Sequence, residues 1–218
     1  MQDTIPLRRM GPYAGVLPLA TRPTDEGVGE VVVLVGQERY EPGWRDALRW
    51  SDFGGGVEPD VDRDEIEAAA RECYEETMGM LGSRDGIESA LRASAADGTL
   101  RWVRSPKGAV VFALDVPYDA NLPLYFARAA AYAADAASHL KATRDGVGGA
   151  TPPCGFPPEG YYEKTAVEWV PLDTLRALVL QALPSAEARA SGRQSPRATP
   201  DPGLLRDDFV RTIVRFFD

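Results

Sequence analysis

The strongest constraint on the fold is a short apolar run at residues 30–36, Glu-Val-Val-Val-Leu-Val-Gly. Because this run has no polar alternation, it predicts a strand that is buried on both faces and needs a layer of structure on each side of its sheet. Strands and helices that are interleaved along the chain predict an α/β fold with a mixed, partly parallel β-sheet. Further strands are predicted at 13–20, 108–116 and 166–170, and helices at 64–77, 84–96 and 172–182.

The length of 218 residues is typical of one domain, and we place that domain at residues 1–183. An alanine-rich segment at about 122–144 strongly favours helix and forms a helical insertion in the domain. The segment 184–203 is rich in Pro, Ser, Ala and Arg without an apolar period, which predicts a flexible linker or surface loop. Apolar residues at helical spacing then predict a C-terminal helix at 204–218 that docks on the domain.

Charge and cysteine content exclude several classes of protein. With 24 Lys and Arg against 33 Asp and Glu, the net charge is −9, so the whole molecule is not drawn to the phosphates of DNA. No apolar run reaches the roughly 20 residues that span a bilayer. The two cysteines, Cys73 and Cys154, are far apart and indicate a reducing compartment. We therefore expect a cytoplasmic protein without a membrane partner.

Three carboxylates share one turn of the predicted helix at 64–77. Glu72, Glu75 and Glu76 stand at i, i+3 and i+4, so they form one patch and repel one another unless a cation sits among them. Mg²⁺ suits such a patch because it takes one or two protein carboxylates and keeps positions for water and substrate phosphates. Arg71 can pair with one of the acids and orient it. Taken alone, the pattern also fits a solvated acidic helix face.

The surrounding residues favour the metal site over the solvated face. Residues 54–56 are Gly-Gly-Gly, and residues 71–77 are Arg-Glu-Cys-Tyr-Glu-Glu-Thr. Together they resemble the Nudix box, written G-x5-E-x7-R-E-U-x-E-E-x-G-U with U an aliphatic residue. Gly55 matches the opening glycine, and Cys73 occupies the aliphatic position. Outside the motif, the resemblance to Nudix hydrolases extends more loosely over residues 13–182.

Two departures from the motif concern its spacing. The step from Gly55 to Arg71 is 16 positions where the pattern has 14, so the loop is two residues longer. Met78 stands where the pattern has its last glycine, and Gly79 follows one position late. The first acid of the motif is then one of three residues, of which we favour Glu65 because it shares a helix face with the later acids. The three residues are Asp62, Asp64 and Glu65.

The resemblance implies an α/β/α sandwich that hydrolyses a pyrophosphate bond in a nucleoside diphosphate linked to another moiety, with Mg²⁺ or Mn²⁺ as cofactor. It also implies a general base near the late strand, for which we choose Glu163 first and Glu168 second. Independently of the resemblance, Arg39 and Lys164 are candidates for phosphate contacts, and Phe53 for contact with the substrate. The implied metal site comprises Glu72, Glu75, Glu76 and Gly55, and the implied catalytic residues are Glu163, Glu75 and Arg71.

Other hypotheses stay open at this point. Removal of the mRNA cap uses the same chemistry on capped RNA, but it needs a basic surface that follows the RNA, and the net charge of −9 disfavours it. Diphosphoinositol phosphates need a dense Lys and Arg cluster, which we do not find. A catalytically silent Nudix-fold module that binds a nucleotide or a protein is expected to lose a motif glutamate, yet all three remain. A small nucleotide is therefore the expected partner, and the added segments offer a contact for a homodimer.

Overall fold

The structure is a computed structural model of the chain. It describes residues 11–25, 27–146, 161, 163–191 and 205–217, and within these ranges the side chains of 136–146 and 188–189 are not described. Seven strands of the described part form one sheet. They are β1 (Tyr13–Arg22), β2 (Glu30–Glu38), β3 (Trp50–Ser51), β4 (Phe53–Gly56), β5 (Trp102–Arg104), β6 (Val110–Asp115) and β7 (Lys164–Pro171).

Strand β1 lies at the centre of the sheet. It pairs with β6 in parallel, with Val16 opposite Phe112, and with β2 and β4 in the antiparallel direction. On the outer side of β2, both β3 and β7 pair antiparallel, and β5 extends the sheet beyond β6. The sheet is thus mixed, which confirms the predicted fold class. The strand order also brings β4 and β7, which are distant in the sequence, toward the centre of the domain.

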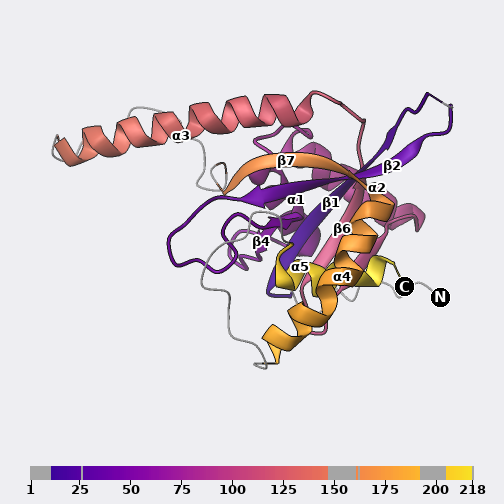
Figure 1. Ribbon diagram of the computed structural model, residues 1–218. Coiled ribbons are helices and arrows are strands. Elements are labelled where there is room, and N and C mark those ends of the chain that lie inside the picture. The colour runs from indigo at the N-terminus through magenta and orange to yellow at the C-terminus, as the bar shows by residue number, and fades with distance from the viewer. Residues whose placement is uncertain (1–10, 26, 147–160, 162, 192–204, 218) are drawn as a thin grey trace.

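Helices cover both faces of the sheet (Figure 1). Helices α1 (Glu65–Glu76) and α2 (Arg84–Asp97) lie on one face, while α4 (Leu172–Ala190) and α5 (Asp207–Ile213) lie on the other. Strand β2 shows why two layers are needed. Val32 and Leu34 belong to the core beside α1, and Val33 and Val35 belong to the core beside α4 and α5, each of them at most 2% exposed. The predicted burial of this strand on both faces is confirmed.

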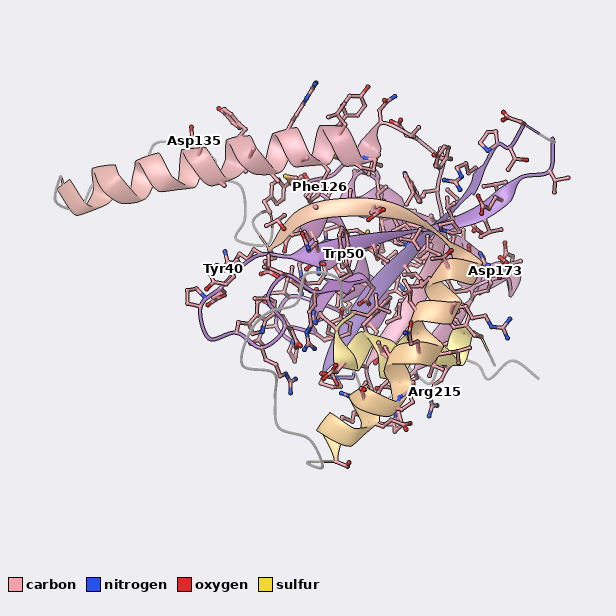
Figure 2. The ribbon with its side chains drawn as sticks, in the orientation of Figure 1. Tyr40, Trp50, Phe126, Asp135, Asp173 and Arg215 are labelled. Carbon is pink, nitrogen blue, oxygen red and sulfur yellow. The ribbon has the colours of Figure 1, made fainter. Side chains whose placement is uncertain are left out.

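Helix α3 (Leu122–Gly146) corresponds to the alanine-rich segment. It runs along β7 with its first half and extends past the sheet with its second (Figure 1). Phe126 anchors the first half, because its ring is fully buried beneath the helix (Figure 2). Tyr132, one turn and a half further on, is 77% exposed. Among the described residues, none of the helices is both long and apolar enough to cross a membrane.

The C-terminal part differs from the sequence prediction in one respect. A linker was expected from residue 184, but α4 continues through Pro184 to Ala190, so the prediction is wrong for residues 184–190. The alanine content after Pro184 favours helix, and Ala186 is fully buried against the body. The rest of the predicted linker, 192–204, lies outside the described residues. Helix α5 and a following 3-10 turn (Val214–Phe216) pack on α4.

Candidate functional site

Helix α1 carries the acidic residues, and its ends are defined by local interactions. The side chain of Asp64 accepts hydrogen bonds from the backbone N–H groups of Ile66 and Glu67, both at 3.0 Å, so Asp64 is the N-cap of the helix. Gly79, with φ of +71°, follows the helix in the left-handed conformation that glycine adopts readily after a helix end. The apolar stripe of α1 packs on the sheet and includes Cys73, which is fully buried, and burial raises the pKa of its thiol.

We expect Asp64→Ala to destabilise the protein by about 1 kcal/mol, because two helix-end N–H groups lose their acceptor. Asp64 also pairs with Arg92 at 2.9 Å, which adds to the loss. Asp64→Asn is the matched control, since an asparagine oxygen also caps a helix. Urea unfolding measures both variants, and equal destabilisation by Asn and Ala would show that the cap contributes nothing.

The glycine-rich stretch is a strand and not the loop that the sequence suggested. Strand β4 fits between β1 and α1 only because it has no side chains at Gly54 and Gly55. A Cβ atom at Gly54 would lie 2.4 Å from the Cα atom of Gly15, and one at Gly55 would lie 2.6 Å from the carboxylate of Glu72. The backbone of Gly55 therefore lies against the first acid of the cluster.

Two carboxylates of α1 remain open to a cation. Glu72 is 8% exposed and accepts from Arg71 at 2.7 Å, and burial raises its pKa to about 7. Glu75 lies 3.7 Å from the same guanidinium and keeps 22% of its side chain exposed. Burial also raises the pKa of Glu75, and the nearby charge of Glu163 adds to this effect. Both raised values have the same physical meaning: ionisation of these groups is disfavoured while no further cation is close.

Arg71 is held by more than one acid. Its Nε and Nη2 donate to the two oxygens of Asp62 at 3.1 and 2.9 Å, and Nη2 also donates to the carbonyl of Gly56 at 3.0 Å. This two-point contact fixes the plane of the guanidinium, and Nη1 is thereby aimed at Glu72. Arg71 thus orients an acid, as the sequence predicted.

The first motif acid is placed differently from our preference. Glu65 accepts from the backbone N–H of Gly11 at 2.6 Å and from Arg104 at 2.8 Å, so its carboxylate is engaged away from Arg71. The helix face that we expected Glu65 to share with the later acids thus does not bring its carboxylate into contact with Arg71. Of the three candidates, Asp62 is the one that contacts Arg71, and its position before the helix, outside the 3.6-residue period, explains why periodicity did not favour it.

Glu76 has a partner on each oxygen. Oε2 accepts from the backbone N–H of Gly54 at 2.7 Å, and Oε1 lies 3.2 Å from the ammonium of Lys164. The residue is 2% exposed, and burial raises its pKa well above the ordinary value. Glu76 therefore ties α1 to the glycine strand and is not an open carboxylate like Glu72 and Glu75.

Two of the predicted substrate contacts are wrong, because both residues are buried. Lys164 donates to Glu38 at 2.6 Å and to Ser51 at 2.9 Å, and with Glu76 these partners occupy all three donors of its ammonium. Phe53 is fully buried in the core beside α1. Neither side chain can meet a ligand from solvent in this arrangement.

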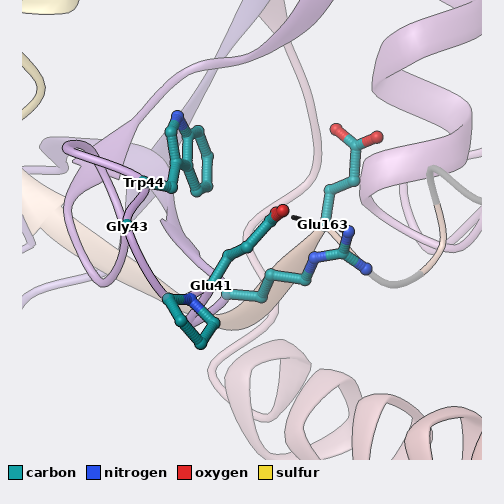
Figure 3. Close-up of a pocket in the computed structure, with 6 residues that line it drawn as sticks. Glu41, Gly43, Trp44 and Glu163 are labelled. Carbon is teal, nitrogen blue, oxygen red and sulfur yellow. Dashed lines mark ion pairs between the residues drawn. The ribbon is translucent and has the colours of Figure 1, made fainter.

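The remaining predicted residues meet at a cavity of about 490 Å³ near the acidic helix. Arg39 and Glu163 both line it, and the backbone N–H of Arg39 donates to the carbonyl of Glu163 at 2.8 Å. Trp44 and Glu41 also line it, and Figure 3 shows Glu41 between Trp44 and Glu163 in this view. The charge of Glu163 raises the pKa values of the α1 acids, which places its carboxylate within electrostatic reach of them. The second candidate for the base, Glu168, lies in β7 opposite Val35 and is exposed.

The loop that forms this cavity reaches the surface at Tyr40, which is 59% exposed (Figure 2). The sequence alone did not single out Trp44, because the chain has several aromatic residues and no local pattern shows which of them lines a cavity. Sequence reasoning also missed Glu38 and Ser51, which contact Lys164, and Arg206, which pairs with Glu38. Contacts between residues so far apart in the chain leave no periodic signal.

The side-chain oxygens available beside the cavity determine whether a metal ion can bind there. In the described part of the chain, no group of three or more His, Cys, Asp or Glu side chains is arranged as a ready cage. Glu72 and Glu75 nevertheless fit a hard dication, because such an ion needs only one or two carboxylates and fills its other positions with water and phosphate oxygens. Burial raises the pKa of both carboxylates although Arg71 acts to lower it, so a further cation beside them would favour their ionised forms. Glu76, with both oxygens engaged, does not fit as well.

Comparisons with known proteins show little beyond this geometry. No family model matches the sequence, and neither does any curated protein. Among solved structures, the NUDIX domain of Shewanella oneidensis NrtR complexed with ADP ribose aligns over 86% of this chain and 90% of that chain, with 12% identity and a TM-score of 0.35. A mutT/nudix family protein from Listeria innocua aligns over 85% and 98% of the two chains, with 13% identity and a TM-score of 0.36. Values this low show neither a family nor an activity.

Proposed function

We propose that the protein is a Nudix hydrolase that cleaves a pyrophosphate bond in a nucleoside diphosphate linked to another moiety, with Mg²⁺ or Mn²⁺ as cofactor. The observation that carries this proposal is the pair Glu72 and Glu75. The carboxylate of Glu72 lies beside Gly55 of the glycine strand, both carboxylates share Arg71, and burial raises the pKa of each. Such a pair is suited to a dication that also binds phosphates.

Each residue has a defined task in this proposal. A dication held by Glu72 and Glu75 supplies neutralisation of the phosphate charge and a lower pKa for a bound water. Arg71 keeps the plane of Glu72 fixed, since its own position is set by Asp62. Gly55 allows the backbone to approach the acids closely.

Glu163 is the proposed general base. Its side chain is exposed at the edge of the cavity, so an attacking water and its proton are accessible to it. A carboxylate in this place is suited to accept the proton of the attacking water, so Glu163 is preferred over the buried acids of α1.

The cavity of about 490 Å³ is the proposed place for part of the substrate. Arg39 offers a planar guanidinium to phosphate oxygens, and Trp44 offers an aromatic surface. Arg39 is now paired with Glu41 at 3.6 Å, an exposed contact of the kind that contributes little energy. An incoming phosphate can therefore replace Glu41 at low cost.

A substrate screen tests the proposal. Purified protein is incubated with nucleotide sugars, dinucleoside polyphosphates, ADP-ribose, NAD(H), oxidised nucleoside triphosphates and capped RNA, each with Mg²⁺, with Mn²⁺ or with EDTA. We expect turnover of at least one nucleoside diphosphate derivative that depends on the dication. Saturable nucleotide binding without turnover in every arm would favour the silent binding module, and turnover confined to capped RNA would favour mRNA decapping.

We expect Glu163→Gln to lower kcat by at least about 100-fold, because the attacking water loses its proton acceptor. The same variant should keep the thermal shift that Mg²⁺ produces, since Glu72 and Glu75 are unchanged. Steady-state kinetics and thermal unfolding measure the two quantities. Glu168→Gln is measured in parallel. If that variant loses kcat and Glu163→Gln does not, Glu168 of β7 is the general base instead.

A further inference from the structure

Four charged side chains meet beneath the candidate site; three of them are at most 2% exposed, and the fourth, Arg206, keeps 21% of its side chain exposed. We call them the charge quartet: Glu76 of α1, Lys164 of β7, Glu38 of β2 and Arg206 before α5. Lys164 lies 3.2 Å from Glu76 and 2.6 Å from Glu38, and the Nη1 of Arg206 donates to the same oxygen of Glu38 at 2.8 Å. Two carboxylates and two cations balance, so the quartet is neutral as a whole. Burial raises the pKa of Glu38, but Lys164 and Arg206 together hold that pKa below its ordinary value.

The backbone of the C-terminal segment is held without the side chain of Arg206. Its N–H donates to the carbonyl of Trp50 at 2.9 Å, and Asp207 pairs with the buried Arg49 at 3.1 Å. Helix α5 adds three apolar side chains, each at most 4% exposed: Phe209, Val210 and Ile213. Removal of the Arg206 side chain therefore leaves the segment docked, and its loss acts on the groups that the guanidinium itself meets, which are Glu38, Trp44 and, at 4.0 Å, Asp46.

Arg206 reaches the candidate site along two routes. The first runs through Glu38 and Lys164 to Glu76, whose other oxygen accepts from the N–H of Gly54 in the glycine strand. The second is direct, because the guanidinium carbon of Arg206 lies 5.9 Å from the centre of the Trp44 ring, and Trp44 lines the cavity. One side chain from the end of the chain thus supports both the acidic helix and the wall of the cavity.

We propose that Arg206 is a positioning residue for the candidate site. Because Arg206 also pairs with Glu38, Lys164 is shared between Glu38 and Glu76. Glu76 in turn holds the glycine strand in place beside Glu72. Without Arg206, Lys164 is the only cation of the quartet for two buried carboxylates. A buried carboxylate that loses its partner is strongly destabilised, so the ammonium is drawn toward Glu38 and away from Glu76. The hydrogen bond from Gly54 then weakens, and strand β4 loosens beside the metal-binding acids. The catalytic consequence rests on the proposed function, whereas the structural consequence does not.

Hydrogen exchange of the metal-free, full-length protein provides the primary test. In Arg206→Gln we expect the amide of Gly54 to exchange about tenfold faster, because a hydrogen bond to a charged group is worth roughly 1.5 kcal/mol or more. Arg206→Lys should restore part of the protection. The matched control is Arg215→Gln, an exposed arginine of the same segment that donates to the carbonyl of Arg104 (Figure 2). This control should leave residues 53–56 unchanged.

A charge-balanced double variant separates positioning from general damage. Glu38→Gln removes the carboxylate that competes for Lys164. In the Glu38→Gln, Arg206→Gln variant the one remaining carboxylate, Glu76, is therefore balanced by Lys164, and Gly54 should regain its protection. Faster exchange confined to 205–217 in Arg206→Gln, or a double variant no better than the single one, would overturn the proposal.

Kinetics gives the second readout, with the best substrate from the screen. Arg206→Gln should lower kcat by about tenfold or more with KM changed less than kcat, because the acids are misplaced by a fraction of an ångström. An unchanged kcat overturns the positioning role. If the unmodified protein turns over no nucleotide at all, the proposed function fails, and the exchange at Gly54 still decides whether Arg206 positions the strand.

Discussion

Glu75→Gln is expected to abolish the metal-dependent turnover of the protein. Glu75 is one of the two open carboxylates of α1, and an amide binds a dication far more weakly than a carboxylate does. Loss of groups that merely support a metal ligand already costs about 10- to 100-fold, so loss of a ligand should cost at least the larger of these factors. Steady-state kinetics over a range of Mg²⁺ concentrations measures the effect.

The same variant should be as stable as the unmodified protein in EDTA, or more stable. Burial raises the pKa of Glu75, so the ionised form of this side chain destabilises the folded state. This free-energy cost grows as the pH rises from the ordinary pKa of a glutamate to the raised pKa, and it is fully present above the raised pKa. Glutamine removes the charge and the cost with it. Mg²⁺ should raise the Tm of the unmodified protein but not of the variant. Full activity with an unchanged response to Mg²⁺ would contradict the assignment of Glu75.

Gly55→Ala is expected to produce the second large loss. The added Cβ would lie 2.6 Å from the Glu72 carboxylate, closer than real contacts allow, so either the carboxylate or strand β4 must move. A misplacement of about 1 Å in a catalytic site can lower activity about 100-fold. Both kcat and the affinity for Mn²⁺ should fall, and the affinity can be followed by titration calorimetry without substrate.

Gly56→Ala is the matched control for this prediction. Gly56 is the next residue of the same strand, but a Cβ atom there meets nothing within 4 Å. The two variants thus add the same methyl group to neighbouring positions and differ only in what it contacts. Similar activity losses in both would mean that the close approach at Gly55 has no special importance for the site.

Much of α1 was predictable because its determinants are local. The cap at Asp64, the stop at Gly79 and the grouping of acids three and four positions apart all follow from the geometry of one helix. For the same reason the strand 30–36 was predictable, since its unbroken apolar run has only one stable environment.

The roles of single side chains were less predictable, and Lys164 shows why. Its charge made it a candidate for a phosphate contact, yet its ammonium pairs with Glu38, 126 residues earlier in the chain. Glu76 and Glu75 are neighbours on one helix, but only Glu76 meets the N–H of Gly54 and the buried lysine. Local patterns cannot distinguish them, because the difference lies in what other strands bring to each oxygen.

The sequence by itself determined an α/β chain whose capped helix gathers carboxylates, since periodicity and capping act over a few residues. Only the tertiary structure decided which carboxylates stay open, which arginine neutralises the interior, and where the cavity lies. Arg206 meets Glu38 across 168 residues. Such a contact depends on sheet order and on the docking of the C-terminal segment, and these arise from the packing of the whole core and not from any short stretch of residues.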